Sequence, residues 1–271
     1  MNEELPAYSL DLDTSPPPRL ARAATQAIDR DWAWAGSTGK GVRVCVLDSG
    51  IEAGHPLVGE VQRAVVVNVD ENGNAALVDD EGCDVSGHGT ACASIIRSLA
   101  PDCELTSVRV LTDKLQGGGA QLIEGLRWAV RERHQVVNLS LSTAKRAFAA
   151  ALHDLADEAY FHRTVIVASA HNMHVDSWPW RFSSVVSVAS HTDPDPMTFF
   201  YNADPPVEFL ARGVDVTMAW LGGGTIRATG NSFAAPHMAG ICALILGSHP
   251  DLTAFQLKHV LYETATNVER Q

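Results

Sequence analysis

The chain has 271 residues, 46% of them apolar, and a net charge of −12 from 20 basic and 32 acidic side chains. This composition supports one large buried core, and the acidic charge disfavours nucleic acid and anionic membranes as partners. No apolar run is long enough to cross a bilayer, and Met1 precedes acidic, proline-containing sequence instead of a basic and apolar signal region. We therefore expect a cytoplasmic protein with no nucleic-acid partner and no membrane partner.

Strands and helices alternate along most of the chain. Apolar, β-branched runs predict strands at residues 42–47, 65–69, 105–111, 136–141, 164–169 and 185–189. Amphipathic stretches predict helices at 121–133 and 144–161, and a last helix begins at Thr253, which forms a capping-box pattern with Gln256. This alternation predicts an α/β fold with three αβα layers and a mostly parallel central sheet. Residues 1–26 lack periodicity and are expected to form an N-terminal extension to a main domain at 27–271.

Four polar residues fall where such a fold brings strand ends and helix starts to one rim. Asp48 ends the first strand, Asn172 follows the fifth, His88 precedes an apolar helix, and Ser232 begins the helix of the segment GNSFAAPHMAG. Each has a purely structural reading as a turn former or a helix cap. Ligands of parallel α/β sheets bind at the carboxyl ends of the strands, so the joint occurrence of these four residues favours a catalytic site.

The blocks DSG at 48–50, HGT at 88–90 and GNSFAAPHMAG around Ser232 resemble the three signature blocks of subtilisin-like serine proteases, in the same order. The resemblance covers residues 27–268 and implies a subtilisin-like catalytic domain at 27–271. It implies a serine endopeptidase that works through an acyl-enzyme, with Asp48, His88 and Ser232 as the triad and Asn172 as an oxyanion donor. A catalytically quiet, peptide-binding relative is the alternative.

The residue types suit the implied roles. The Ser232 hydroxyl is a weak nucleophile until a base removes its proton, and His88 is the natural base near neutral pH. By analogy with the family, Asp48 holds the imidazole in one tautomer and stabilises the imidazolium. The Asn172 amide and the Ser232 backbone N–H would donate hydrogen bonds to the oxyanion.

Three segments depart from the family pattern without changing the triad. The nucleophile block usually reads Gly-Thr-Ser, and here Asn231 stands in place of the threonine. The oxyanion segment has His171 where a glycine usually precedes the asparagine, and Ser142-Thr143 stands where glycines usually line the cleft. These changes bear on specificity and rate.

The resemblance also implies a set of substrate-binding residues for a peptide or protein substrate. An extended peptide is expected to pair with a glycine edge and to lie along the residues that follow the fourth strand. Asp176 precedes a small residue, Ser177, at the expected floor of the primary specificity pocket, which would favour a basic side chain, Arg above Lys. Most relatives prefer large apolar residues at that position. The expected substrate-binding residues are Gly117, Gly118, Gly119, Ser140, Leu141, Ser142 and Asp176.

No cofactor and no metal site are expected. His171, His174 and Asp176 lie at no standard ligand spacing, and the acidic residues 79–84 are interpreted as a solvated loop. The apolar helix at 91–99 lacks the calcium-binding insertion of many relatives. Five cysteines without a CxxC pair suit a reducing compartment. Intracellular processing of a precursor, a regulatory cut and general turnover remain open as the physiological role.

Overall fold

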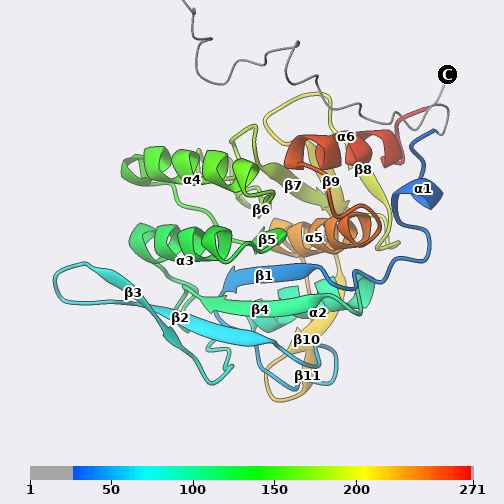
Figure 1. The fold of residues 1–271 in the computed structure, drawn as a ribbon. Helices are drawn as coiled ribbons and strands as arrows, with labels where there is room; N and C mark the ends of the chain where they lie inside the picture. The colour runs from blue at the N-terminus through cyan, green and yellow to red at the C-terminus, as the bar shows by residue number, and fades with distance from the viewer. Residues whose placement is uncertain (1–26, 270–271) are drawn as a thin grey trace, which may run out of the picture.

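A single large sheet runs through the molecule in the computed structural model, which describes residues 27–269 (Figure 1). Its strands are β1 (Arg43–Asp48), β2 (Arg63–Val69), β3 (Ala75–Asp79), β4 (Glu104–Arg109), β5 (Val136–Leu139), β6 (Val165–Ser169), β7 (Val186–His191), β8 (Phe199–Tyr201) and β9 (Phe209–Arg212). They are arranged in the order β3-β2-β4-β1-β5-β6-β7-β9-β8. The inner pairs are parallel, and the antiparallel pairs β2–β3 and β8–β9 form the two edges.

Helices cover both faces of this sheet. They are α1 (Arg30–Trp34), α2 (His88–Leu99), α3 (Gly119–Arg131), α4 (Ala149–Phe161) after the short 3-10 helix η1 (Arg146–Phe148), α5 (Asn231–Ser248) and α6 (Ala254–Thr264). On β1, Val44 and Val46 face the layer that holds α2 and α5, whereas Cys45 and Leu47 face α3 and α4. This alternation is the period of two of a β-strand buried on both faces. A separate hairpin of β10 (Val216–Trp220) and β11 (Gly224–Ala228) packs against α2.

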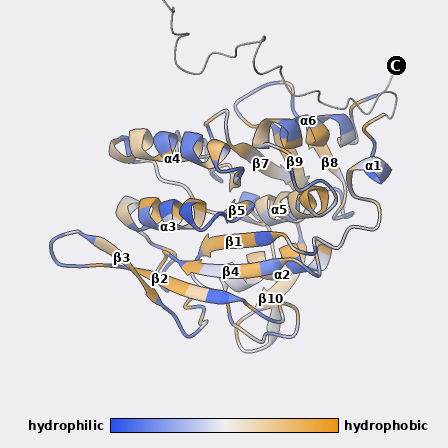
Figure 2. Cartoon of the chain, viewed as in Figure 1, coloured by the Kyte–Doolittle hydropathy of each residue, from blue (hydrophilic) through white to orange (hydrophobic). Residues whose placement is uncertain are grey.

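Hydropathy follows the layers. Helices α3 and α4 each carry a hydrophobic and a hydrophilic side, whereas β1 is largely hydrophobic and β4 (ELTSVR) mixes hydrophobic and hydrophilic residues (Figure 2). Helix α5 differs from both, because residues 233–246 are buried on all sides. Helix α6 begins with the expected capping box, in which the Thr253 side chain accepts from the Gln256 N–H and the Gln256 side chain accepts from the Thr253 N–H. Within residues 27–269, no helix combines the length and hydropathy needed to cross a membrane.

The three-layer α/β fold with its mostly parallel sheet is confirmed, and the six predicted strands are present with shifted ends. The short strands β3, β8 and β9 and the β10–β11 hairpin were not predicted. Residues 144–161 divide into η1 and α4, so the prediction of one continuous helix there was wrong. The expected extension, residues 1–26, lies outside the described residues.

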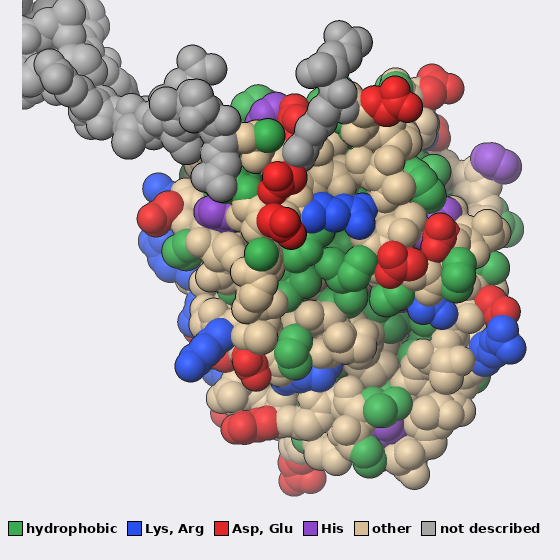
Figure 3. Space-filling view, turned by 90° about the vertical axis from the view of Figure 1, so that its right-hand side faces the viewer, with side chains coloured by type: hydrophobic (Ala, Val, Ile, Leu, Met, Phe, Trp, Pro, Cys, Tyr) green, Lys and Arg blue, Asp and Glu red, His purple; other side chains and the backbone are tan. Residues whose placement is uncertain are grey.

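Two glycines bring the end of β1 against the start of α2. A Cβ atom on Gly89 would lie 2.0 Å from the carbonyl oxygen of Gly50, and Gly50 itself has a φ of +106°. Only glycine satisfies both the contact and the left-handed backbone. The arrowheads of β1 and β4 point to the left in Figure 1, which places the strand ends and the start of α2 on that side. Figure 3 shows the opposite face, where hydrophobic, acidic and basic side chains are intermixed.

Candidate active site

Asp48 and His88 form a close pair at the junction of β1 and α2. His88 Nδ1 lies 2.8 Å from Asp48 Oδ1 and 2.9 Å from Oδ2. Asp48 is fully buried, and Oδ1 also accepts the Ser49 N–H at 2.8 Å. A carboxylate accepts only, so the proton of neutral His88 is assigned to Nδ1. Nε2 is then free to act as a base.

The surroundings of His88 change how readily it takes up a proton. Burial lowers its pKa, whereas the Asp48 charge, the Asp48 hydrogen bond and the Asp84 charge raise it. The raising effects prevail, and the pKa of His88 lies above the ordinary value of 6.5. The residue is therefore a stronger base than a solvent-exposed histidine, which suits proton transfer from a hydroxyl.

Ser232 is the second residue of α5 and lines the same cleft as His88, a cavity of about 570 Å³. No hydrogen bond between Ser232 Oγ and His88 is recorded among residues 27–269, and such contacts are often long in the absence of substrate. A hydrogen bond holds the backbone of Ser232, because its carbonyl accepts from Ser140 Oγ at 2.7 Å. Cys92 Sγ lies 3.3 Å from the same Ser140 oxygen. The hydrogen bond from Ser140 therefore holds the backbone of the candidate nucleophile, Ser232.

Asn172 also lines this cleft, and one of its side-chain atoms already has a partner. Its Oδ1 accepts the Asn231 N–H at 2.9 Å, which leaves the Nδ2 group to donate. Asn231 in turn accepts the Ser190 N–H at 2.9 Å through Oδ1 and donates to the His171 carbonyl at 3.4 Å. The asparagine that replaces the usual threonine thus ties the start of α5 to β7 and to the Asn172 segment.

The structure brings most of the expected substrate-binding residues to the cleft. It is lined by Gly117, Gly118, Gly119, Ser140, Leu141 and Ser142, together with His88, Asn172 and Ser232. Gly117 and Gly118 belong to no strand and Gly119 begins α3, so these glycines do not form the expected edge strand. Asp176 does not line the cleft. Its side chain is 68% exposed and forms an ion pair with Arg181.

Comparison with known proteins decides the family. The model of the subtilase family matches residues 39–271, a range that includes all four catalytic candidates. The chain belongs to the subtilase family. It is 32% identical over 250 residues to subtilisin E of Bacillus subtilis (strain 168), covering 85% of this chain and 62% of that relative. It is also 30% identical to subtilisin DY of Bacillus licheniformis, over 86% of each chain.

A solved structure, described as a cold adapted subtilisin-like serine proteinase, superposes with a TM-score of 0.68. It is 26% identical and covers 85% of this chain and 86% of its own. The shared fold and the family match support serine endopeptidase activity for this subtilase. The fold class expected from the signature blocks is thereby confirmed.

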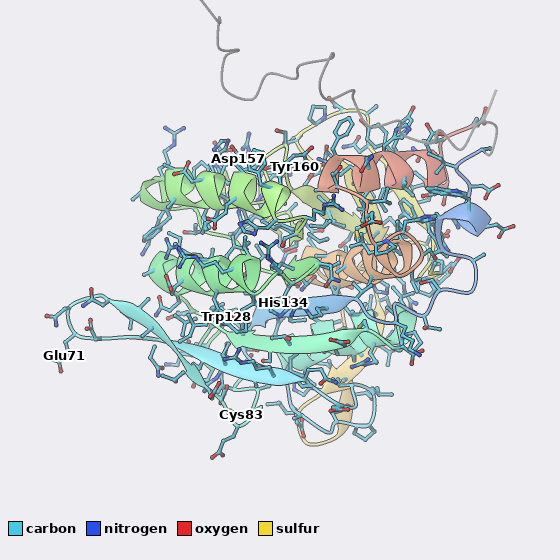
Figure 4. All side chains as sticks on the ribbon, viewed as in Figure 1. Glu71, Cys83, Trp128, His134, Asp157 and Tyr160 are labelled. Carbon is cyan, nitrogen blue, oxygen red and sulfur yellow. The ribbon has the colours of Figure 1, made fainter. Side chains whose placement is uncertain are left out.

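Potential metal ligands cluster at one place in residues 27–269 of the subtilase, namely Asp48, His88 and Cys92. Two members of this cluster, Asp48 and His88, already form hydrogen bonds with each other. His171, His174 and Asp176 form no such cluster. Cys92 is fully buried, whereas Cys83 is exposed at the periphery (Figure 4).

Asp84 is a structural residue of the subtilase site that the sequence analysis missed. It was assigned to a solvated acidic loop, but its carboxylate accepts five hydrogen bonds. The donors are Ser49 Oγ, the N–H groups of Ser86, Gly87 and Thr90, and Thr90 Oγ1, at 2.6–2.9 Å. The N-cap position, Gly87, has no side chain to cap α2, and Asp84 supplies the acceptor instead. Asp84 thus connects the segment after Asp48 to the helix that carries His88.

Proposed function

We propose that this subtilase hydrolyses peptide bonds through Ser232, with His88 as the general base and Asp48 as its partner. The main support for the proposal is the contact of both Asp48 carboxylate oxygens with His88 Nδ1. His88 lines the same cleft as Ser232 and Asn172. With Nδ1 bound to Asp48, Nε2 can accept a proton, and Ser232, the proposed nucleophile, lies in the same cavity.

The chemistry proceeds in two halves. Ser232 Oγ attacks the carbonyl carbon of the peptide bond while His88 Nε2 accepts the hydroxyl proton. Asn172 Nδ2 and the Ser232 N–H stabilise the resulting oxyanion, aided by the positive end of α5. The intermediate collapses as His88 returns the proton to the leaving amine, which leaves an acyl-enzyme. A water molecule, deprotonated by His88, then attacks the acyl carbon. The ester bond to Ser232 Oγ breaks as His88 returns the proton to Oγ, and the carboxylic acid product leaves.

The proposed substrates are peptides or proteins, and we propose intracellular processing of a precursor in the cytoplasm as the role. The five cysteines of the described part are free thiols, which suits a reducing compartment. The net charge of −12 favours the approach of cationic substrates. Cell fractionation tests the location, and recovery of the protein mainly from the culture medium would contradict it.

Labelling with a fluorophosphonate probe tests the activity directly. We expect the probe to modify the wild type at Ser232 and to leave Ser232→Ala unlabelled, with a loss of turnover on the order of a million-fold in that variant. A folded Ser232→Ala protein that retains full activity would contradict the mechanism. A folded wild type that is neither labelled nor active would instead support the quiet, peptide-binding alternative.

A further inference from the structure

The position of the residue before the cleaved bond follows from the proposed function. Its carbonyl carbon must lie against Ser232 Oγ and its carbonyl oxygen against the Asn172 amide. Its side chain therefore enters the part of the cleft between residues 140–143 and 169–172, which line the cavity on either side. These segments follow β5 and β6, which pair in parallel up to Leu139 and Ala168.

One wall of this part of the cleft is held by a bridge of two hydroxyl groups. Ser142 lines the cleft, and its Oγ lies 3.1 Å from the Oγ of Ser177, which is fully buried. Ser177 Oγ also accepts the indole N–H of Trp180 at 2.8 Å. Both serine side chains therefore have fixed partners, and Ser142 cannot turn away from the wall without breaking the bridge.

The backbone behind the bridge is equally fixed. The Thr143 N–H donates to the Trp178 carbonyl at 2.9 Å, and the Trp178 N–H donates to the Thr143 carbonyl at 3.0 Å. This pair of bonds keeps residues 142–143 and 177–178 at the spacing of adjacent strands. A large side chain entering here would have to separate them, and close-packed walls resist such a change.

We propose that Ser142 and Ser177 determine specificity by closing a short, hydroxyl-lined pocket, so that the subtilase cleaves after small residues such as Ala and Ser. This inference rests on the proposed function and names the substrate class of the same site. Asp176 does not supply a charge to this pocket, because it is exposed and paired with Arg181. A basic side chain thus meets no free carboxylate among the residues lining the cleft.

The test is a series of tetrapeptide anilides that differ only in the residue before the cleaved bond: Ala, Ser, Leu, Phe or Arg. A peptide library analysed by mass spectrometry gives the preference without bias. For the wild type we expect kcat/KM to be at least about tenfold higher for Ala than for Phe. Ser142→Gly and Ser177→Gly remove the bridge, and each is expected to raise the Phe-to-Ala ratio by about tenfold.

Ser183→Gly is the matched control, because Ser183 is exposed and outside the cleft. It should leave the ratio unchanged, and thermal melting shows whether each variant is folded. A wild-type preference for Phe, Leu or Arg overturns the inference even if neither variant folds. An unchanged ratio in both folded variants also overturns it. In these cases labelling of Ser232 shows that the proposed function stands, whereas an unlabelled, inactive wild type means that the function itself has failed.

Discussion

Replacing Asp84 with Asn perturbs the connection between Asp48 and His88, the proposed catalytic pair. In the wild type, Oδ1 accepts from Ser49 Oγ and from the Ser86 and Gly87 N–H groups, while Oδ2 accepts from the N–H and Oγ1 of Thr90. An asparagine with its oxygen in the Oδ1 position keeps the first three bonds. Its amide group then faces two donors of Thr90, and the backbone donor has no other acceptor in the first turn of α2.

The magnitude follows from this one lost backbone bond. Thr90 is fully buried, and a buried donor left without an acceptor costs about 1–3 kcal/mol. Loss of a helix cap costs about 0.5–2 kcal/mol, but it describes the same N–H group and is not added. We therefore expect the free energy of unfolding to fall by about 1–3 kcal/mol, which a domain of ordinary stability, about 5–15 kcal/mol, tolerates.

Two measurements check this prediction. Urea unfolding gives the stability change, and the pH profile of kcat/KM reports the pKa of His88 in the free enzyme. Burial lowers that pKa, whereas Asp48 and Asp84 raise it, so removing the Asp84 charge lowers it. Because the base acts when neutral, the acidic limb of the profile should move to lower pH.

Asp102→Asn is the control for the Asp84 variant. Its carboxylate is exposed and has no hydrogen-bond partner recorded among residues 27–269. If Asp84→Asn shifts neither the stability nor the acidic limb relative to this control, the role assigned to Asp84 is refuted. A stability loss without any shift of the limb would refute the electrostatic part alone.

Three further predictions follow from other contacts. Asn172→Ala should lower kcat by about 100- to 1,000-fold, the typical loss for one oxyanion donor, and wild-type turnover in that variant would contradict its role. A mercurial should slow the enzyme through Cys92, whose Sγ lies 3.9 Å from Asp48 Oδ2, and inhibition that persists in Cys92→Ser would point elsewhere. Burial lowers the pKa of His237 to about 4, from an ordinary value of 6.5. As the pH falls, His237 therefore takes up its proton in the unfolded chain before it does so in the folded protein. The free energy of unfolding should fall by about 3 kcal/mol between pH 6.5 and 4. This pH dependence should be lost in His237→Gln.

The sequence was sufficient to propose the triad positions because local pattern and chemistry agree there. A polar residue at a strand end or a helix start is common by itself. Four of them at one predicted rim favour a catalytic site, and Gly89 is required by the close approach of Gly50. The order of the elements then predicted one rim for Asp48, His88 and Ser232. The parallel sheet was predicted for a similar reason, since strands buried on both faces leave continuous apolar runs.

The capping role of Asp84 could not be predicted from the local sequence. It caps α2 from four residues before His88, outside the usual N-cap position, and the acidic residues beside it resemble a solvated loop. The ion pair of Asp176 depends on the path of the irregular segment that leads to Arg181, and no local sequence pattern specifies that path. Strand β8, at one edge of the sheet, and its neighbour β9 have three and four residues, too few to show a period.

Helix α5 places Ser232, the proposed nucleophile, directly before residues 233–246, which are buried between the sheet and the neighbouring helices. A segment of this kind exchanges its amide hydrogens only when the whole domain opens. Residues 233–246 are therefore not expected to unfold separately from the rest of the domain. For a protease, unfolded copies are substrates for folded ones, so activity and resistance to self-digestion are lost in the same transition. The working lifetime of the enzyme is then set by the rate of global unfolding.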